Sequence, residues 1–208
     1  MDEIISYFPN LTELQLAQFI KLGALYQDWN QKINVVSRKD IENIYPHHIL
    51  HSMAIAKYVK FKPEARVLDL GTGGGLPGIP LAILFPATNF TLIDGTKKKI
   101  SVVQAIIEDL ELENVQARQV RAEELKERFD FVICRAVASL EKLAIWSIPL
   151  LSKQEMHAIP NGLITLKGGN LKEERQALPR GTYVDIVPIS NYFNFPFFKE
   201  KVLVYVQQ

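Results

Sequence analysis

The sequence predicts an α/β fold in which a seven-stranded, mostly parallel sheet follows an N-terminal helical extension and ends in an antiparallel C-terminal hairpin. Two observations support this fold class. Up to about residue 62, apolar residues recur at helical spacing, whereas from Ala65 onward short apolar runs alternate with helical stretches. Such alternation is typical of βαβ units with a parallel sheet. We therefore expect an extension over 1–62 and one compact domain over 63–208.

Two helices are expected in the extension. The first begins after Pro9-Asn10, and its apolar positions near helical spacing are Leu11, Leu14, Phe19, Leu22, Leu25 and Tyr26. The second runs from about Asp40 to Tyr58. Pro46 should interrupt it, because proline removes a backbone hydrogen bond and clashes with the preceding turn.

Short apolar runs predict the strands of the domain at 66–70, 89–94, 115–120, 130–134, 162–167, 183–189 and 201–207. Helices are expected between the first two strands, over 76–85, and between the next two, over 97–110. Only the Asn-, Pro- and Phe-rich segment 191–198 separates the last two strands. Because this segment is too short for a crossover helix, these two strands should pair antiparallel.

Composition and charge limit the classes of function. The 208 residues suffice for one such domain, and a formal net charge of +1 gives no global basic field, so any nucleic-acid contact must come from a local patch. Apolar stretches are too short to span a bilayer, and no secretory signal is evident. A single cysteine, Cys134, excludes an internal disulfide and a cysteine-based zinc cluster. We expect a cytoplasmic protein.

A glycine-rich loop, Gly71-Thr-Gly-Gly-Gly75, follows the first strand and opens a helix. Glycine there lets the backbone approach a ligand and adopt positive φ. The loop alone also fits a dinucleotide-binding fingerprint. Asp94 ends the second strand 19 residues after Gly75 and suits a ribose-binding carboxylate for either cofactor.

Asp69, at the end of the first strand, distinguishes the two cofactors. A carboxylate there would repel a pyrophosphate bound at the helix N-terminus. S-adenosylmethionine has no phosphate and carries an ammonium and a sulfonium, which a carboxylate attracts. We therefore predict a class I, Rossmann-like methyltransferase that uses S-adenosylmethionine and releases S-adenosylhomocysteine. Two alternatives stay open: Asp69 caps a turn within a tight glycine bend, or the chain is a nucleotide-binding module or NAD-dependent oxidoreductase.

Longer segments resemble the RsmG family, formerly called glucose-inhibited division protein B. The matching motifs are Asp69-Leu-Gly-Thr-Gly-Gly-Gly-Leu-Pro-Gly-Ile-Pro-Leu-Ala82, Leu92-Ile-Asp-Gly-Thr-Lys-Lys-Lys99, Arg121-Ala-Glu-Glu124, Phe129-Asp-Phe-Val-Ile-Cys-Arg-Ala-Val-Ala-Ser139, Leu166-Lys-Gly168, Trp29-Asn-Gln-Lys-Ile-Asn34 and His48-Ile-Leu50. The proline-containing Gly75-Leu-Pro-Gly78 is the most specific part. The resemblance implies a bacterial enzyme that methylates N7 of a guanine in the 530 loop of 16S ribosomal RNA. Its partner would be 16S rRNA or the 30S particle, and we expect a monomer with no membrane partner.

The chain departs from the family pattern at two places. The family usually has Arg-His-Ile-Leu-Asp-Ser where this chain has His47-His-Ile-Leu-His51-Ser, which puts a role for that basic–acidic pair in doubt. The family usually has Asp-Ser where this chain has Asp94-Gly95, which removes one hydroxyl contact to the cofactor.

The chemistry implied by the resemblance needs no general base, because guanine N7 carries an in-plane lone pair and no proton. It needs in-line placement of the two reacting atoms. No Asn-Pro-Pro-aromatic motif, which methylation of an amino group would favour, follows the fourth strand. Carbon methylation would use a cysteine nucleophile, but Cys134 lies within an apolar strand, where a buried structural thiol is expected. The alternative is a methyltransferase of the same fold that acts on a small molecule or a protein.

Two arginines are the candidate catalytic residues. Arg135 ends the fourth strand and could hold the cofactor carboxylate, or guanine O6 and a phosphate; a strand-end salt bridge is the alternative. By resemblance, Ala122 and Glu123 bracket the adenine and Arg121 faces the RNA, although acids at a helix start explain Glu123 equally well. The expected cofactor-binding residues are Asp69, Gly71, Gly73, Leu76, Asp94, Gly95, Thr96, Ala122, Glu123 and Arg135.

RNA contacts are expected at Lys97, Lys98, Lys99 and His48. The lysines stand in the first turn of a helix, where cations oppose the helix dipole, so helix stability does not explain them. Two explanations stay open: they contact an RNA phosphate, or they form a solvated charged face. We expect no metal site, since His47, His48 and His51 have no obvious supporting ligands. Tyr26 and Trp29 are expected in the core.

Overall fold

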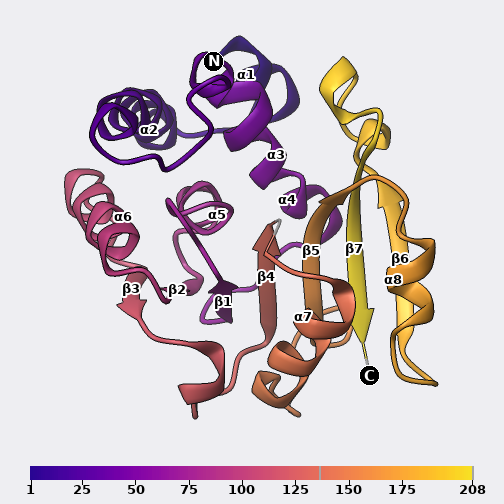
Figure 1. The fold of residues 1–208 in the computed structure, drawn as a ribbon. Helices are drawn as coiled ribbons and strands as arrows, with labels where there is room; N and C mark the ends of the chain where they lie inside the picture. The colour runs from indigo at the N-terminus through magenta and orange to yellow at the C-terminus, as the bar shows by residue number, and fades with distance from the viewer. Residues whose placement is uncertain (136, 208) are drawn as a thin grey trace.

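The computed structural model describes residues 1–135 and 137–207 and contains one seven-stranded sheet with strand order β3-β2-β1-β4-β5-β7-β6 (Figure 1). The strands are β1 (Arg66–Leu70), β2 (Asn89–Asp94), β3 (Val115–Gln119), β4 (Phe131–Arg135), β5 (Gly162–Gly168), β6 (Tyr183–Pro188) and β7 (Lys201–Gln207). The predicted strands and the α/β class are therefore confirmed, with strand ends that differ from the prediction by at most one residue.

The sheet is parallel from β3 through β5 and antiparallel at its C-terminal end. Strand β1 lies between β2 and β4, and β5 continues the parallel series beyond β4. Strand β7 runs antiparallel to both β5 and β6 and lies between them. The predicted hairpin is confirmed, and its second strand forms the inner position of the pair. The central strands β1 and β4 are buried along most of their length, as expected for parallel strands covered on both faces.

Helices cover both faces of the sheet. One face carries α5 (Gly78–Leu84), α6 (Lys97–Asp109) and the N-terminal helices; the other carries α7 (Leu140–Ser147) and α8 (Lys172–Gln176) (Figure 1). Helix α5 begins two residues later than predicted, because Leu76 and Pro77 still belong to the loop. Helices α7 and α8 were not predicted.

The extension contains α1 (Asp2–Tyr7), which was not predicted, and α2 (Glu13–Lys32). Helix α2 begins at a capping box, in which the Thr12 hydroxyl accepts from the Gln15 amide and the Gln15 side chain accepts from the Thr12 amide. The expected second helix is a series of short turns: a 3-10 helix (Ile41–Asn43), a π-helix (Ile44–Ile49), α3 (Leu50–Met53) and α4 (Ile55–Tyr58). Pro46 lies inside the π-helix, so the predicted interruption is confirmed as a widened turn.

One hydrophobic cluster joins the extension to the sheet. Phe19, Leu22 and Tyr26 of α2 are fully buried in the same cluster as Ile79 and Leu81 of α5. The extension therefore packs on the helix that follows the glycine loop. The division at residue 62 stays a prediction. Among the described residues, no helix has the length and apolar character needed to cross a membrane.

Candidate active site

The glycine loop between β1 and α5 has the backbone conformation that its sequence predicts. Gly71, Gly73 and Gly75 have φ values of 70°, 59° and 96°, in the region that favours glycine. The Thr72 amide donates to the Ile93 carbonyl over 2.9 Å, which fixes the loop against the end of β2.

A cavity of about 270 Å³ lies beside this loop, at the carboxyl ends of β1, β2 and β3. Its lining residues are Leu70, Gly71, Ile93, Asp94, Gly95, Val120, Arg121, Ala122, Glu123 and Trp146. The cavity thus brings together predicted residues from three separate motifs: the glycine loop, the end of β2 and the turn after β3. Ligands of open α/β sheets bind at this edge.

Asp94 connects the glycine loop to the start of α6. Its Oδ2 accepts from the Gly73 amide over 3.1 Å, and its Oδ1 accepts from the Thr96 amide over 2.8 Å. Each carboxylate oxygen has a second lone pair, so Asp94 can still accept a hydrogen bond from a ligand hydroxyl. A Cβ added to neighbouring Gly95 would meet nothing within 4 Å, so this side of the site is open. Gly73 and Thr96 support Asp94 through their amides and are not part of the cavity lining.

The turn after β3 and helix α7 supply the remaining part of the cavity wall. Ala122 begins a short 3-10 turn and is buried, while Arg121 and Glu123 beside it are exposed. Trp146 of α7 completes this wall. Trp146 was not predicted, because no helix was expected over 140–147.

Asp69, a predicted cofactor residue, is not among the residues that line the cavity. Its side chain is fully buried, and Oδ2 accepts from the Thr72 hydroxyl over 2.6 Å and from the Gly78 amide over 2.8 Å. A Cβ added to Gly78 would lie 2.7 Å from Asp69 Oδ2, so glycine permits this approach. Burial raises the pKa of Asp69 to about 7, although the two hydrogen bonds and nearby Arg135 oppose the shift. Oδ2 therefore caps the loop, as in the turn-capping alternative, while the buried Oδ1 has no hydrogen-bond partner within the described residues. A contact of Asp69 with the cofactor stays a prediction.

Leu76, another predicted cofactor residue, is buried in the hydrophobic cluster and does not line the cavity. It follows the glycines directly, and its side chain points into the core because the loop turns there to begin α5. Its contribution in this structure is to anchor the loop.

Two side chains of the extension, those of Tyr26 and Val35, contact the backbone of Gly74. The Tyr26 hydroxyl donates to the Gly74 carbonyl over 2.9 Å, and Tyr26 is fully buried. A Cβ added to Gly74 would lie 2.8 Å from the Val35 side chain, so Val35 packs directly on the glycine backbone. Burial raises the pKa of Tyr26, so the hydroxyl keeps its proton and remains a donor. Tyr26 is confirmed as a core residue, and Trp29 is partly buried against the same core.

Arg135 ends β4 and reaches toward the extension rather than into the cavity. Its Nη1 donates to the His48 carbonyl over 3.4 Å. Within the part of the chain that the structure describes, Arg135 forms no ion pair, which disfavours the salt-bridge alternative. Arg135 is close enough to Asp69 and Tyr26 to influence their titration. It is partly exposed at the end of β4 and lies between the extension and the sheet.

Two of the three predicted histidines, His47 and His48, contact one carboxylate, that of Asp40. His47 Nδ1 lies 2.7 Å from Asp40 Oδ1, and His48 Nε2 lies 3.0 Å from Asp40 Oδ2. The His47 ring stacks on Phe197 with centroids 3.9 Å apart, and His51 meets the same ring edge-on. Burial lowers the pKa of His48 to about 4. The His48 imidazole is directed at Asp40, so an RNA contact by this ring would require it to leave that carboxylate.

The remaining predicted residues fall in two groups. Lys97 and Lys98 are exposed at the start of α6, whereas Lys99 lies 4.0 Å from Asp94 Oδ2 and partly offsets its charge. Cys134 is confirmed as a buried thiol, and burial raises its pKa to about 12. A thiol with this pKa stays protonated at neutral pH and is a poor nucleophile.

Comparison with protein families places this site in context. The family model described as "rRNA small subunit methyltransferase G" matches residues 15–194. A ribosomal RNA small subunit methyltransferase G from Flavobacterium johnsoniae is 53% identical over 206 residues, covering 99% of this chain and 97% of that protein. The protein of that name from Bacteroides thetaiotaomicron is 50% identical over 207 residues and covers 100% of both chains.

Solved structures with a similar fold are more distant in sequence. Ribosomal protein L11 methylase from Lactobacillus delbrueckii subsp. bulgaricus is 16% identical with a TM-score of 0.59, and the match covers 76% of each chain. Precorrin-6y C5,15-methyltransferase from Geobacter metallireducens is 12% identical with a TM-score of 0.58, covering 76% of this chain and 87% of that one. These similarities show the Rossmann-like methyltransferase fold.

Proposed function

We propose that this chain, which belongs to the rRNA small subunit methyltransferase G family, transfers a methyl group from S-adenosylmethionine to N7 of a guanine in the 530 loop of 16S rRNA. The observation that carries the proposal is the cavity between Asp94 and the Arg121–Glu123 turn, beside the glycine loop. It lies where this fold binds its ligands, in a chain whose full-length relatives carry that family name.

The residues around the cavity fit the nucleoside part of S-adenosylmethionine. Asp94 retains free lone pairs for the ribose hydroxyls, and Ile93, Ala122 and Trp146 offer apolar surface to an adenine. The volume of about 270 Å³ is just below the roughly 300–1,000 Å³ of typical small-molecule sites. We infer that the amino-acid part extends along the glycine loop, past Gly71 and Gly73. When bound, the cofactor supplies an activated methyl group on a sulfonium.

The chain's own residues need to orient the guanine and need not remove a proton. N7 has a free lone pair, so the reaction requires alignment of N7 with the methyl group. Cys134 is buried and protonated, which agrees with a mechanism that has no cysteine nucleophile. We assign Arg135 to hold guanine O6, because a donor at O6 leaves N7 free, and we assign the exposed Arg121 to the RNA backbone at the rim.

Exposed Lys97 and Lys98 would extend this basic rim along the start of α6. Their charges suit phosphate contacts, which supply most of the affinity of nucleic-acid complexes that lack base readout. We further propose that the chain acts as a cytoplasmic monomer on 16S rRNA or the 30S particle.

Transfer of tritium from labelled S-adenosylmethionine tests the proposed substrate. We expect label in the 16S rRNA of 30S subunits that lack the modification, with Asp94→Ala protein as the inactive control. Label found only in protein or in small molecules would contradict the proposal and favour a methyltransferase of the same fold with another substrate.

A further inference from the structure

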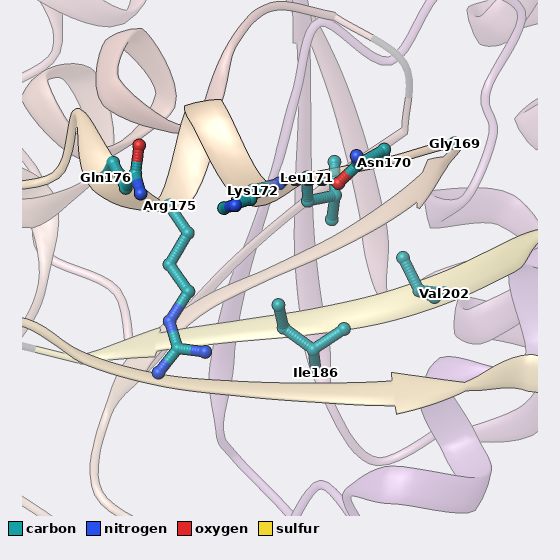
Figure 2. Close-up of a pocket in the computed structure, with 8 residues that line it drawn as sticks. All are labelled: Gly169, Asn170, Leu171, Lys172, Arg175, Gln176, Ile186 and Val202. Carbon is teal, nitrogen blue, oxygen red and sulfur yellow. Dashed lines mark hydrogen bonds between the residues drawn. The ribbon is translucent and has the colours of Figure 1, made fainter.

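A second cleft lies outside the candidate active site, between α8 and the strands β6 and β7 (Figure 2). Its volume is about 590 Å³, which is within the range of small-molecule sites. The lining residues are Gly169, Asn170, Leu171, Lys172, Arg175, Gln176, Ile186 and Val202. None of them has a role in the function proposed above.

The cleft combines an apolar floor with a guanidinium. Ile186 and Val202 project from the strands and are partly exposed, and Leu171 is buried at the start of α8. Figure 2 shows the Arg175 side chain extending from α8 over the strands, beside Ile186. Aliphatic side chains next to a planar, charged donor group suit the face and edge of an unstacked nucleobase.

The two cations of the cleft are free to meet an anion. Lys172 and Arg175 are exposed, and neither forms an ion pair within the described residues. The neighbouring Glu174 is engaged elsewhere, since its carboxylate pairs with Lys167 and accepts from the Leu140 amide over 2.7 Å. Glu173 does not line the cleft. In a chain with a net charge of +1, such a local pair of cations matters for binding a polyanion.

The cleft is connected to the segment that follows Arg135. The Lys167 ammonium donates to the Ala138 carbonyl over 2.8 Å and also pairs with Glu174 of α8. Glu174 in turn accepts from Leu140, the first residue of α7. Helix α8 is thereby fixed to the loop after β4, at the carboxyl edge of the sheet, where the reaction is proposed to occur. Arg135 reaches toward the extension, on the face of the sheet opposite α8. An RNA strand that crosses the carboxyl edge of the sheet would connect a nucleotide near Arg135 with a second one in this cleft.

We propose that the α8 cleft binds an unpaired nucleotide of the RNA substrate, across the carboxyl edge of the sheet from the methylated guanine. The base lies on Ile186 and Val202, and a phosphate lies near Lys172 and Arg175. This inference rests on the proposed rRNA substrate, and it adds a second contact point that fixes which nucleotide enters the active site.

Variants of the two cations test the cleft directly. Arg175→Ala and Lys172→Ala are compared with Arg180→Ala, which removes an exposed cation of the same region that does not line the cleft. We expect the KM for 30S subunits lacking the modification to rise roughly threefold to tenfold for the first two variants, and the slope of log affinity against log salt to fall by about 1 for each. The KM for S-adenosylmethionine and the thermal midpoint should match those of Arg180→Ala, because the changed side chains are exposed.

Filter binding of a 16S rRNA fragment containing the 530 loop separates this inference from the proposed function. If the wild type binds the fragment and the two variants bind it more weakly, the cleft contacts RNA even where no methylation is observed. Affinities and salt slopes equal to those of Arg180→Ala would overturn the inference, whatever the activity of the wild type. Ile186→Asp, which places a like charge near the phosphates, should weaken binding further, and unchanged binding would also contradict the role of the floor.

Discussion

The Tyr26 hydroxyl is a long-range support of the glycine loop, and Tyr26→Phe removes it with the least other change. The hydroxyl donates to the Gly74 carbonyl over 2.9 Å at a fully buried position, so no water can replace it without rearrangement. A buried carbonyl left without its donor costs about 1–3 kcal/mol. The Thr72 carbonyl still accepts from the Gly75 and Leu76 amides, so the loop should loosen rather than unfold.

We expect two measurable consequences of Tyr26→Phe. The thermal midpoint should fall by about 2–4 °C for each kcal/mol lost, as is typical of a chain of this size. Because Gly73 and Gly75 flank the released carbonyl, the dissociation constant for S-adenosylhomocysteine should rise by roughly fivefold to tenfold, equivalent to about 1–1.4 kcal/mol. Calorimetry well below the midpoint measures this constant on folded protein.

Tyr45→Phe is the matched control, because the Tyr45 hydroxyl donates to the Ile20 carbonyl of α2, away from the loop. It should leave the dissociation constant unchanged. If Tyr26→Phe lowers the thermal midpoint but binds S-adenosylhomocysteine as tightly as Tyr45→Phe, then the hydroxyl stabilises the fold without shaping the cofactor site, and the reasoning is refuted.

Three further results are expected. Burial raises the pKa of Asp69 to about 7, above the value near 3.9 of an unfolded aspartate, so the folded state binds this proton more tightly. The free energy of unfolding of the wild type should therefore fall as the pH rises from about 4 to about 7, by up to roughly 1.4 kcal/mol per pH unit. Asp69→Asn should flatten that slope in urea titrations, and an unchanged slope would assign it to other groups. Asp94→Ala should weaken S-adenosylhomocysteine binding by about fivefold to a hundredfold. Glu108→Ala, at an exposed position of α6, is the control and should bind like the wild type. If the two variants bind S-adenosylhomocysteine equally well, Asp94 is not part of the cofactor site. Arg135→Ala should lower kcat by roughly tenfold or more with little loss of thermal stability, because no ion pair is broken; a variant that unfolds at the temperature of the assay would show a structural role instead.

The strands and the glycine loop could be predicted from the sequence because their signals are local. Short apolar runs such as Arg66–Leu70 define buried strands, and the short segment before β7 requires an antiparallel return. The positive φ values of Gly71, Gly73 and Gly75 follow from the same local pattern. Helices α7 and α8 are short and were missed, although Leu140, Leu143 and Ala144 show the helical spacing of a buried face.

The direction of a side chain was beyond the sequence argument. From the sequence, the Asp69 side chain could point to the ligand or back into the loop. The Gly78 amide, at the start of α5, donates a hydrogen bond to Asp69 Oδ2 and so holds the carboxylate against the loop. In this structure Asp69 Oδ2 supports the loop, and a direct contact of Asp69 with the cofactor stays a prediction. Trp146 was missed for a related reason, since only the packing of α7 brings it to Asp94 and Ala122.

The His47–Phe197 stack shows a third limit. These residues are 150 positions apart, and no local pattern joins them. The structure also explains the histidines in a way that spacing could not, because Asp40 lies between His47 and His48 and binds both rings.

Chemical mapping of 16S rRNA tests the proposed reaction most directly. Ribosomal 30S subunits that lack the modification are incubated with the protein and S-adenosylmethionine, and N7-methylguanine is located by borohydride reduction and aniline cleavage of the RNA. We expect one new cleavage, at a guanine of the 530 loop, that disappears with Asp94→Ala protein. Incorporation of methyl groups with no cleavage in that loop would contradict guanine-N7 methylation there, and with it the assignment of Arg135 to guanine O6.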